Sequence, residues 1–242
     1  MCVSVETSFG LAGVLVPAGA YCLKTAWQRD RSALPLAAVP LFFGIQQCSE
    51  GLVWIAIGRE NSEWTKPAAL VYLFLALTFW LFWIPFSAAF LESKRKIKFL
   101  LGLGAVLGLT GGLAFYLPIL LHPEVLVVSV EHHSIRYDFT RSAALKVISE
   151  LEWHVAYLVV VSLPLLLVAR QRRGLIVLGT VLVASAAISH FYFWYAYTSV
   201  WCFFSAVLSL VFAYVFHKFP LATSGNFDVP SVEPVSKLPA HG

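Results

Sequence analysis

The chain has 242 residues, of which 59% are hydrophobic and only 12% are charged. Globular proteins carry about 25% charged residues, so this composition excludes an ordinary water-soluble domain. The formal net charge of +4 does not indicate nucleic-acid binding, because the basic residues fall in short groups between apolar stretches, as membrane topology requires. We therefore expect an integral membrane protein whose immediate partner is the lipid bilayer.

Seven apolar stretches follow one another along the chain, each long enough to cross about 30 Å of hydrocarbon as a helix. Only helices satisfy their own backbone groups in lipid, so the pattern predicts an all-α, polytopic bundle. The transmembrane domain is expected over residues 1–220 and a disordered cytoplasmic tail over 221–242, because the tail is poor in apolar residues. The seven predicted helices cover residues 8–27, 34–57, 68–91, 98–121, 148–169, 174–197 and 199–218.

Lysine and arginine gather in alternate connections between these stretches, and the N-terminus has neither. By the positive-inside rule, the N-terminus is predicted outside the cell membrane and the C-terminus in the cytoplasm. Residues 122–147 then form an outer loop, in which the β-branched segment from Val125 to Tyr137 favours a short hairpin. Close helix packing is expected at the glycines of the first stretch, Gly10, Gly13 and Gly19.

Four residues with chemically active side chains occur inside the apolar stretches, at a similar depth below the outer face. Glu50, His154, His190 and Cys202 belong to four different predicted helices. Ionisable residues at membrane depth are costly, usually face the bundle interior and indicate a functional site. We therefore predict one polar pocket in the outer leaflet, open to the extracytoplasmic side.

The residue types in this pocket suit a metal ion. Glu50, His154 and His190 would be ligands of zinc or copper, with Cys2, Cys202 or water completing the site. Zinc would lower the pKa of a bound water, which favours hydrolysis of a lipid or lipid-linked substrate with Glu50 as ligand or general base. The ligand spacing matches no zinc-protease motif, so it does not identify the metal.

Two other arrangements fit the same residues. His154 and His190 could hold a b-type haem between neighbouring helices, and Cys2 and Cys202 could form a disulfide outside the cell. The alternative to an enzyme is therefore a haem-carrying, metal-carrying or structural subunit of a larger membrane complex. A transporter is disfavoured, because paired repeats with broken helices are not evident.

Four short segments resemble an uncharacterised bacterial family of multi-pass membrane proteins whose members begin Met-Cys-Phe-Ser. They are Met1-Cys2-Val3-Ser4, Gln46 to Trp54, His133 to Tyr137, and Ser199 to Cys202. Val3 departs from the family's Phe. The resemblance implies an integral membrane protein and brings no established activity. The residues in matching segments are Cys2, Glu50, Trp54, His133, Tyr137 and Cys202. Of these we take Glu50, His133 and Tyr137 as candidate catalytic residues, the last two in a lid formed by the outer loop.

Overall fold

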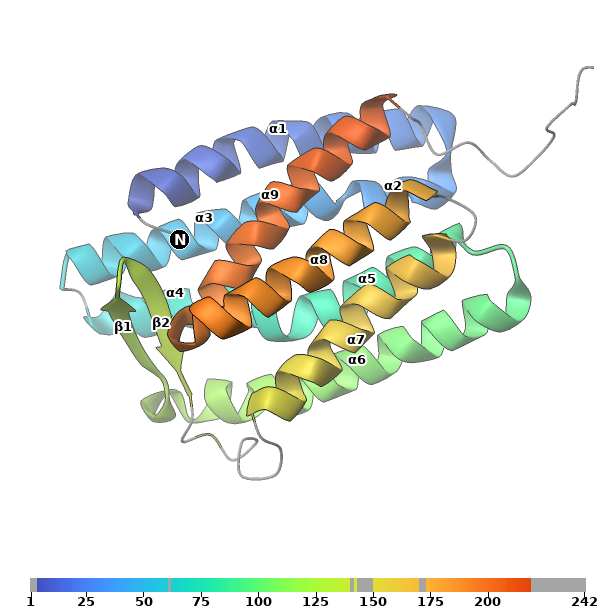
Figure 1. Ribbon diagram of the computed structural model, residues 1–242. Helices are drawn as coiled ribbons and strands as arrows, with labels where there is room; N and C mark the ends of the chain where they lie inside the picture. Colours follow the sequence, from blue (N-terminus) through green and yellow to red (C-terminus); the bar gives the residue numbers. More distant parts are fainter. Residues whose placement is uncertain (1–3, 61, 140–141, 143–149, 170–172, 219–242) are drawn as a thin grey trace, which may run out of the picture.

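The structure is a computed structural model that describes residues 4–60, 62–139, 142, 150–169 and 173–218. These residues form a helical bundle with a two-stranded β-hairpin at one end (Figure 1). The bundle confirms the predicted helical class of fold. In chain order, the main elements are α1 (Val5–Arg29), α2 (Leu34–Ala37), α3 (Val39–Gly58), α4 (Ser62–Phe74), a π-helical segment (Leu75–Phe79), α5 (Trp80–Leu91), α6 (Arg95–Leu121), β1 (Val127–Glu131), β2 (Ser134–Asp138), α7 (Glu150–Ala169), α8 (Arg173–Tyr192) and α9 (Tyr197–Lys218).

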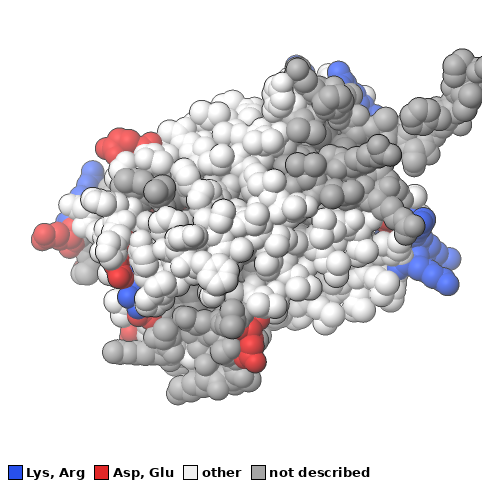
Figure 2. Space-filling model, in the orientation of Figure 1, with Lys and Arg blue, Asp and Glu red and all other residues white. Residues whose placement is uncertain are grey.

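The surface of the bundle is that of a membrane-spanning protein. Figure 2 shows a broad band without charged residues, with Lys, Arg, Asp and Glu gathered at the two ends. Among the described residues, five helical stretches are long and apolar enough to cross a membrane, and these are Val5–Arg29, Arg31–Gly58, Glu63–Leu91, Arg95–Leu121 and Trp194–Tyr214. Two other apolar helices, described with their side chains over residues 152–168 and 179–192, are shorter. The predicted number of seven membrane-spanning helices therefore stays a prediction.

The predicted end of the sixth helix, at residue 197, is wrong. Helix α8 ends at Tyr192, and the chain reverses at Phe193, whose backbone N–H donates to the carbonyl of Ser189 at 3.0 Å. A single 3-10 turn, Trp194–Ala196, then leads directly into α9 at Tyr197. The aromatic run across this reversal contains no charged residue, Pro or Gly, so the sequence gives no signal that ends the helix at Tyr192.

Close helix packing in α1 rests on one of its glycines. A Cβ added at Gly19 would collide with the backbone of Leu41 in α3. One added at Gly10 or Gly13 would meet nothing within 4 Å among the described residues. The expectation therefore holds for Gly19 alone, where the missing side chain lets α1 and α3 approach each other.

The predicted hairpin is confirmed, and it covers one end of the bundle. Strand β1 pairs antiparallel with β2, with Val127 opposite Asp138 and Glu131 opposite Ser134. The connecting residues His132 and His133 have φ of 45° and 59°, as a two-residue hairpin turn requires. Two alternate residues of β2 and the residue that follows the strand are buried against the bundle. These three side chains, Ile135, Tyr137 and Phe139, anchor the hairpin.

Candidate functional site

A buried polar group lies between α3 and α9, below the hairpin. Glu50 of α3 is fully buried, and its Oε1 accepts a hydrogen bond of 2.6 Å from Oγ of Ser199 in the first turn of α9. Ser199 is also fully buried. Because a buried carboxylate is costly unless it is hydrogen-bonded, this contact accounts for how the bundle holds Glu50 at membrane depth.

One turn away, the same interface contains an amide and a thiol. Gln46 of α3 is fully buried, and its Oε1 accepts a hydrogen bond of 2.6 Å from Nε1 of Trp80 in α5. The thiol of Cys202 lies beside the polar ends of Gln46, Tyr72 and Glu50. Two predicted site residues, Glu50 and Cys202, are therefore brought together by α3 and α9.

The hairpin is connected to this interface by stacked tyrosines. The ring of Tyr137 in β2 stacks on that of Tyr72 in α4, with centroids 4.9 Å apart and planes 14° apart. Tyr72 is fully buried, and its hydroxyl donates to the carbonyl of Thr198 at 3.4 Å. Tyr137 thus reaches the buried polar group. His133, in contrast, is exposed at the tip of the hairpin, and its catalytic role stays a prediction.

The π-helical segment between α4 and α5 offers a backbone acceptor to the site. The hydroxyl of Tyr157 in α7 donates to the carbonyl of Ala76 at 2.6 Å, and both residues are buried. A π turn alters the regular helical hydrogen-bond pattern and often marks a functional site. In membrane helices, backbone groups freed in this way are satisfied by neighbouring side chains. This contact fixes α7 against the irregular part of α4–α5.

Replacing Tyr157 with phenylalanine removes this single hydrogen bond and keeps the ring. We expect the free energy of unfolding to fall by about 1 kcal/mol, the usual net contribution of a hydrogen bond. Denaturant unfolding of the purified protein, followed by circular dichroism, measures the change. Tyr192→Phe is the matched control, because Tyr192 is 75% exposed and should leave stability unaltered. Equal stability of the two variants would contradict the assigned contact.

The two membrane histidines also meet, but away from Glu50. The rings of His154 in α7 and His190 in α8 lie with centroids 5.8 Å apart in an edge-to-face arrangement. The ring of His154 also lies 3.9 Å from that of Tyr197. Among the described residues, Nδ1 of His154 has no hydrogen-bond partner although it is buried. The histidine pair is therefore held together by aromatic contacts.

The predicted metal ligands thus fall into two pairs, Glu50 with Cys202 and His154 with His190. Within the part of the chain that the structure describes, no three His, Cys, Asp or Glu side chains are grouped closely enough to hold one metal ion. Cys2, which was predicted as a ligand or as the disulfide partner of Cys202, lies outside the described residues. The metal site stays a prediction.

Three cavities that share lining residues lie between the hairpin and the interior of the bundle. The outer cavity lies beneath the hairpin and includes Arg136, Tyr137, His154 and Ser199 in its lining. A narrow cavity follows. The outer and narrow cavities have five lining residues in common, Phe139, Trp153, His154, Tyr197 and Thr198.

The inner cavity lies between the helices. It shares Tyr157, Trp201 and Cys202 with the narrow cavity. None of the described residues that line it is charged. Its lining is hydrocarbon apart from a few polar groups, which belong to Tyr157, Ser205, Ser209, Cys202, Trp80 and Trp201. A more polar outer cavity and an apolar inner cavity therefore lie on either side of the narrow cavity, which we call the neck and which is lined by His154 and Cys202 among others.

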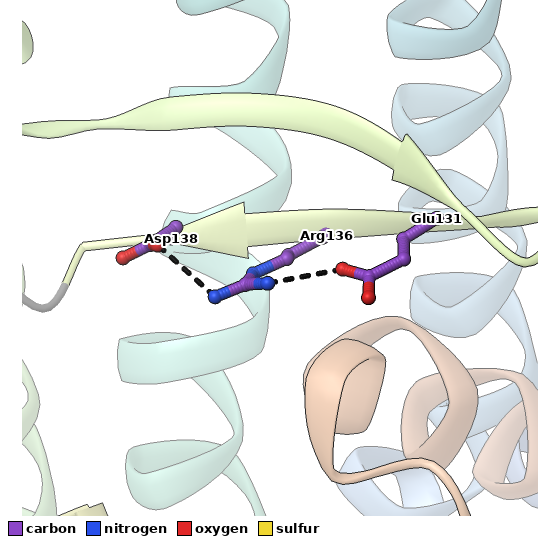
Figure 3. A network of polar contacts seen from close by, with 3 residues as sticks. All are labelled: Glu131, Arg136 and Asp138. Carbon is purple, nitrogen blue, oxygen red and sulfur yellow. Dashed lines mark hydrogen bonds and ion pairs between the residues drawn. The ribbon is translucent and has the colours of Figure 1, made fainter.

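The polar wall of the outer cavity is organised by one arginine. Arg136 of β2 donates to Glu131 Oε2 at 3.0 Å and to Asp138 Oδ2 at 3.2 Å (Figure 3). The hydrogen bond to Glu131 is the main cause that raises the pKa of the Arg136 guanidinium above its usual value. The group is therefore a fixed cation held between two carboxylates.

Several residues of the site were not predicted from the sequence. Ser199 was read as part of a short motif and not as the partner of Glu50, and Tyr72, Trp80 and Arg136 were not considered for the site. The helical spacing of Glu150, His154 and Tyr157 does place Tyr157 on the face of His154. The remaining contacts join residues far apart in the chain, such as the 126 positions between Tyr72 and Thr198.

The long apolar helices of this bundle fit a helical membrane protein. Within that class, residues 1–225 match the Family of unknown function (DUF6629), and the chain belongs to that family. Comparison with curated proteins and with solved structures gave no match. The expected membership of a family without an assigned function is thus confirmed, while the family's opening motif and its source stay predictions.

Proposed function

We propose that this membrane protein binds an amphiphilic lipid or lipid-linked molecule, with its polar part beneath the hairpin and its apolar chain among the helices. The observation that carries the proposal is the set of three cavities with shared lining residues, more polar at the outer end and apolar at the inner end. Sites for small molecules are commonly cavities with a few polar groups in a largely apolar lining, and the inner cavity has such a lining.

A tryptophan placed in the inner cavity tests this proposal. Leu208 lines that cavity, whereas its neighbour Val207 is 38% exposed on another face of α9. Saturable binding of tritiated dodecyl amphiphiles is measured on protein in lipid nanodiscs, with empty nanodiscs as background. Leu208→Trp should weaken binding about tenfold, a loss of roughly 1.4 kcal/mol, and Val207→Trp should leave it unaltered. Equal binding by the two variants, or no saturable binding by the wild type, would overturn the proposal.

The membrane orientation proposed for this function places the hairpin and the outer cavity outside the cell. It is supported by the basic group at 94–98, which precedes and begins α6 at the end of the bundle opposite the hairpin (Figure 1), since the cytoplasmic side carries excess Lys and Arg. Ser129 of β1 is exposed, so Ser129→Cys should react with a membrane-impermeant maleimide in intact cells. Reaction only after the cells are opened would reverse the orientation.

Hydrolysis of the bound molecule is a second candidate function, favoured by the contact between Ser199 and Glu50. Ser199 lines the outer cavity and donates to Glu50 at 2.6 Å. A hydroxyl paired with a base is the arrangement of a nucleophile. Oγ of Ser199 would attack an acyl carbonyl as its proton passes to Glu50; the alcohol would leave with that proton, and water would then release the acid.

Cleavage of a lipid ester reconstituted with the protein tests this chemistry. Ser199→Ala and Glu50→Gln should each abolish the release of free acid. Ser209→Ala should not, because the Ser209 hydroxyl donates to the carbonyl of Ala206 within its own helix. Absence of cleavage by the wild type, or cleavage that survives Ser199→Ala, would exclude hydrolysis by this pair.

One observation supports two other candidate functions, and it is the contact between the rings of His154 and His190. These functions are metal-assisted hydrolysis and a non-enzymatic subunit that carries haem or a metal. Metal analysis and the visible spectrum of the purified protein test both. Stoichiometric zinc or copper that is lost in His154→Ala would support a metal site, and a Soret band would support haem. A colourless protein without bound metal would overturn both.

A further inference from the structure

The outer cavity combines many aromatic rings with one cationic and one anionic side chain, Arg136 and Asp138. Seven of its fourteen lining residues are Phe, Tyr or Trp. These come from the hairpin, from α6 and α7, and from the turn between α8 and α9, so they surround the space from several sides. The faces of aromatic rings carry partial negative charge, and Trp and Tyr attract cations most strongly.

The charged side chains of this wall favour the same sign of ligand. Arg136 donates one N–H to Glu131 and another to Asp138 (Figure 3). Two carboxylates therefore surround one guanidinium, and together the three groups carry one excess negative charge. An anionic headgroup that approached Arg136 would have to displace a carboxylate or lie beside one. A positively charged headgroup meets no such obstacle.

On this basis we infer that the outer cavity takes a positively charged, ammonium-type headgroup, whose alkyl chain extends through the neck to the inner cavity. The inference rests on the proposed binding of an amphiphile and specifies the chemistry of its head. The aromatic rings would contact the ammonium group through cation–π interactions, and Asp138 and Glu131 would supply a favourable potential. The apolar lining of the inner cavity provides for the chain.

Three amphiphiles with the same dodecyl chain test the inference on protein in nanodiscs: dodecyltrimethylammonium, dodecyl maltoside and dodecyl sulfate. The cationic amphiphile should bind about tenfold more tightly than the neutral one, and the anionic one more weakly than both. Partition into empty nanodiscs is subtracted for each headgroup.

Variants of the wall provide a second readout. Asp138→Asn should reduce the preference for the cation, and Arg136→Gln should increase it, while Glu124→Gln, at an exposed acid outside the outer cavity, should leave it unaltered. Trp194→Leu should weaken binding of the cation. Trp64→Leu is its matched control, because Trp64 is 67% exposed and Trp194 68%, and only Trp194 lines the outer cavity.

The outcomes separate the two proposals. Equal affinities for the three headgroups, with binding still weakened by Leu208→Trp, would overturn the inference about the head and leave the binding of an amphiphile in place. A preference for dodecyl sulfate would also overturn it. Absence of saturable binding of any of the three would overturn both proposals.

Discussion

Replacing Glu50 with alanine is expected to lower the free energy of unfolding by about 3 kcal/mol or more. Glu50 and Ser199 are fully buried and joined by a hydrogen bond of 2.6 Å. A hydrogen bond contributes about 0.5–1.5 kcal/mol, and its loss leaves the Ser199 hydroxyl buried without its acceptor, which costs about 1–3 kcal/mol more. The missing carboxylate also leaves a void between α3 and α9. For a protein of this size, the thermal midpoint should fall by roughly 6–12 °C.

Glu50→Gln is the matched control for this change. It keeps the volume and an oxygen that can accept from Ser199, so its cost should be clearly smaller than that of Glu50→Ala. Ser199→Ala and the double variant complete a thermodynamic cycle, from which the coupling energy of the pair follows directly. If Glu50→Ala is as stable as the wild type, the buried hydrogen bond between Glu50 and Ser199 makes no net contribution to stability, and its assigned stabilising role is contradicted.

A methyl group added at Gly108 is expected to destabilise the bundle by about 2 kcal/mol, a typical cost of overpacking. A Cβ at this position would collide with the carbonyl oxygen of Leu81 in α5, and a backbone atom cannot move aside as a flexible side chain can. One turn further along α6, a Cβ at Gly112 would lie 2.8 Å from Cα of Thr78 in the π-helical segment. The two glycines therefore let α6 lie directly on the irregular part of α4–α5.

Gly111→Ala, on the same helix, is the control for Gly108→Ala. A Cβ at Gly111 meets no atom within 4 Å among the described residues, so the change should be neutral or stabilise the helix by up to about 1 kcal/mol through its higher helix propensity. Thermal unfolding of both variants in the same detergent measures the difference. If both variants shift the midpoint alike, the close approach of α6 to α5 is absent.

The sequence predicts the helices of this fold well. In lipid, a membrane-spanning segment needs apolar side chains along its whole length, and a helix satisfies the hydrogen bonds of its own backbone. The hairpin was also predictable, since the β-branched segment from Val125 to Tyr137 contrasts with the helices around it. The end of α8 was not, because the reversal at Phe193 contains no charged residue, Pro or Gly that would mark it.

The site was predicted less completely than the fold, for a physical reason. Depth in the membrane follows from position along a helix, so Glu50, His154 and Cys202 could be placed near one another in height. Which faces meet depends on the rotation of each helix, and this separates the histidine pair from Glu50. The partner of Glu50, Ser199, is a residue type common at helix interfaces, and only the packing of α3 against α9 distinguishes it.

The most direct test of amphiphile binding is the position of the bound chain. A dodecyl amphiphile with a diazirine at the end of its chain is irradiated with the protein in nanodiscs, and the labelled residues are identified by mass spectrometry. Labelling should occur at residues of the inner cavity, such as Leu165, Leu182 and Leu208, and unlabelled amphiphile should abolish it. Labelling confined to residues exposed on α6, such as Val106 and Leu107, would show that the chain lies in the surrounding bilayer and would contradict the proposed site.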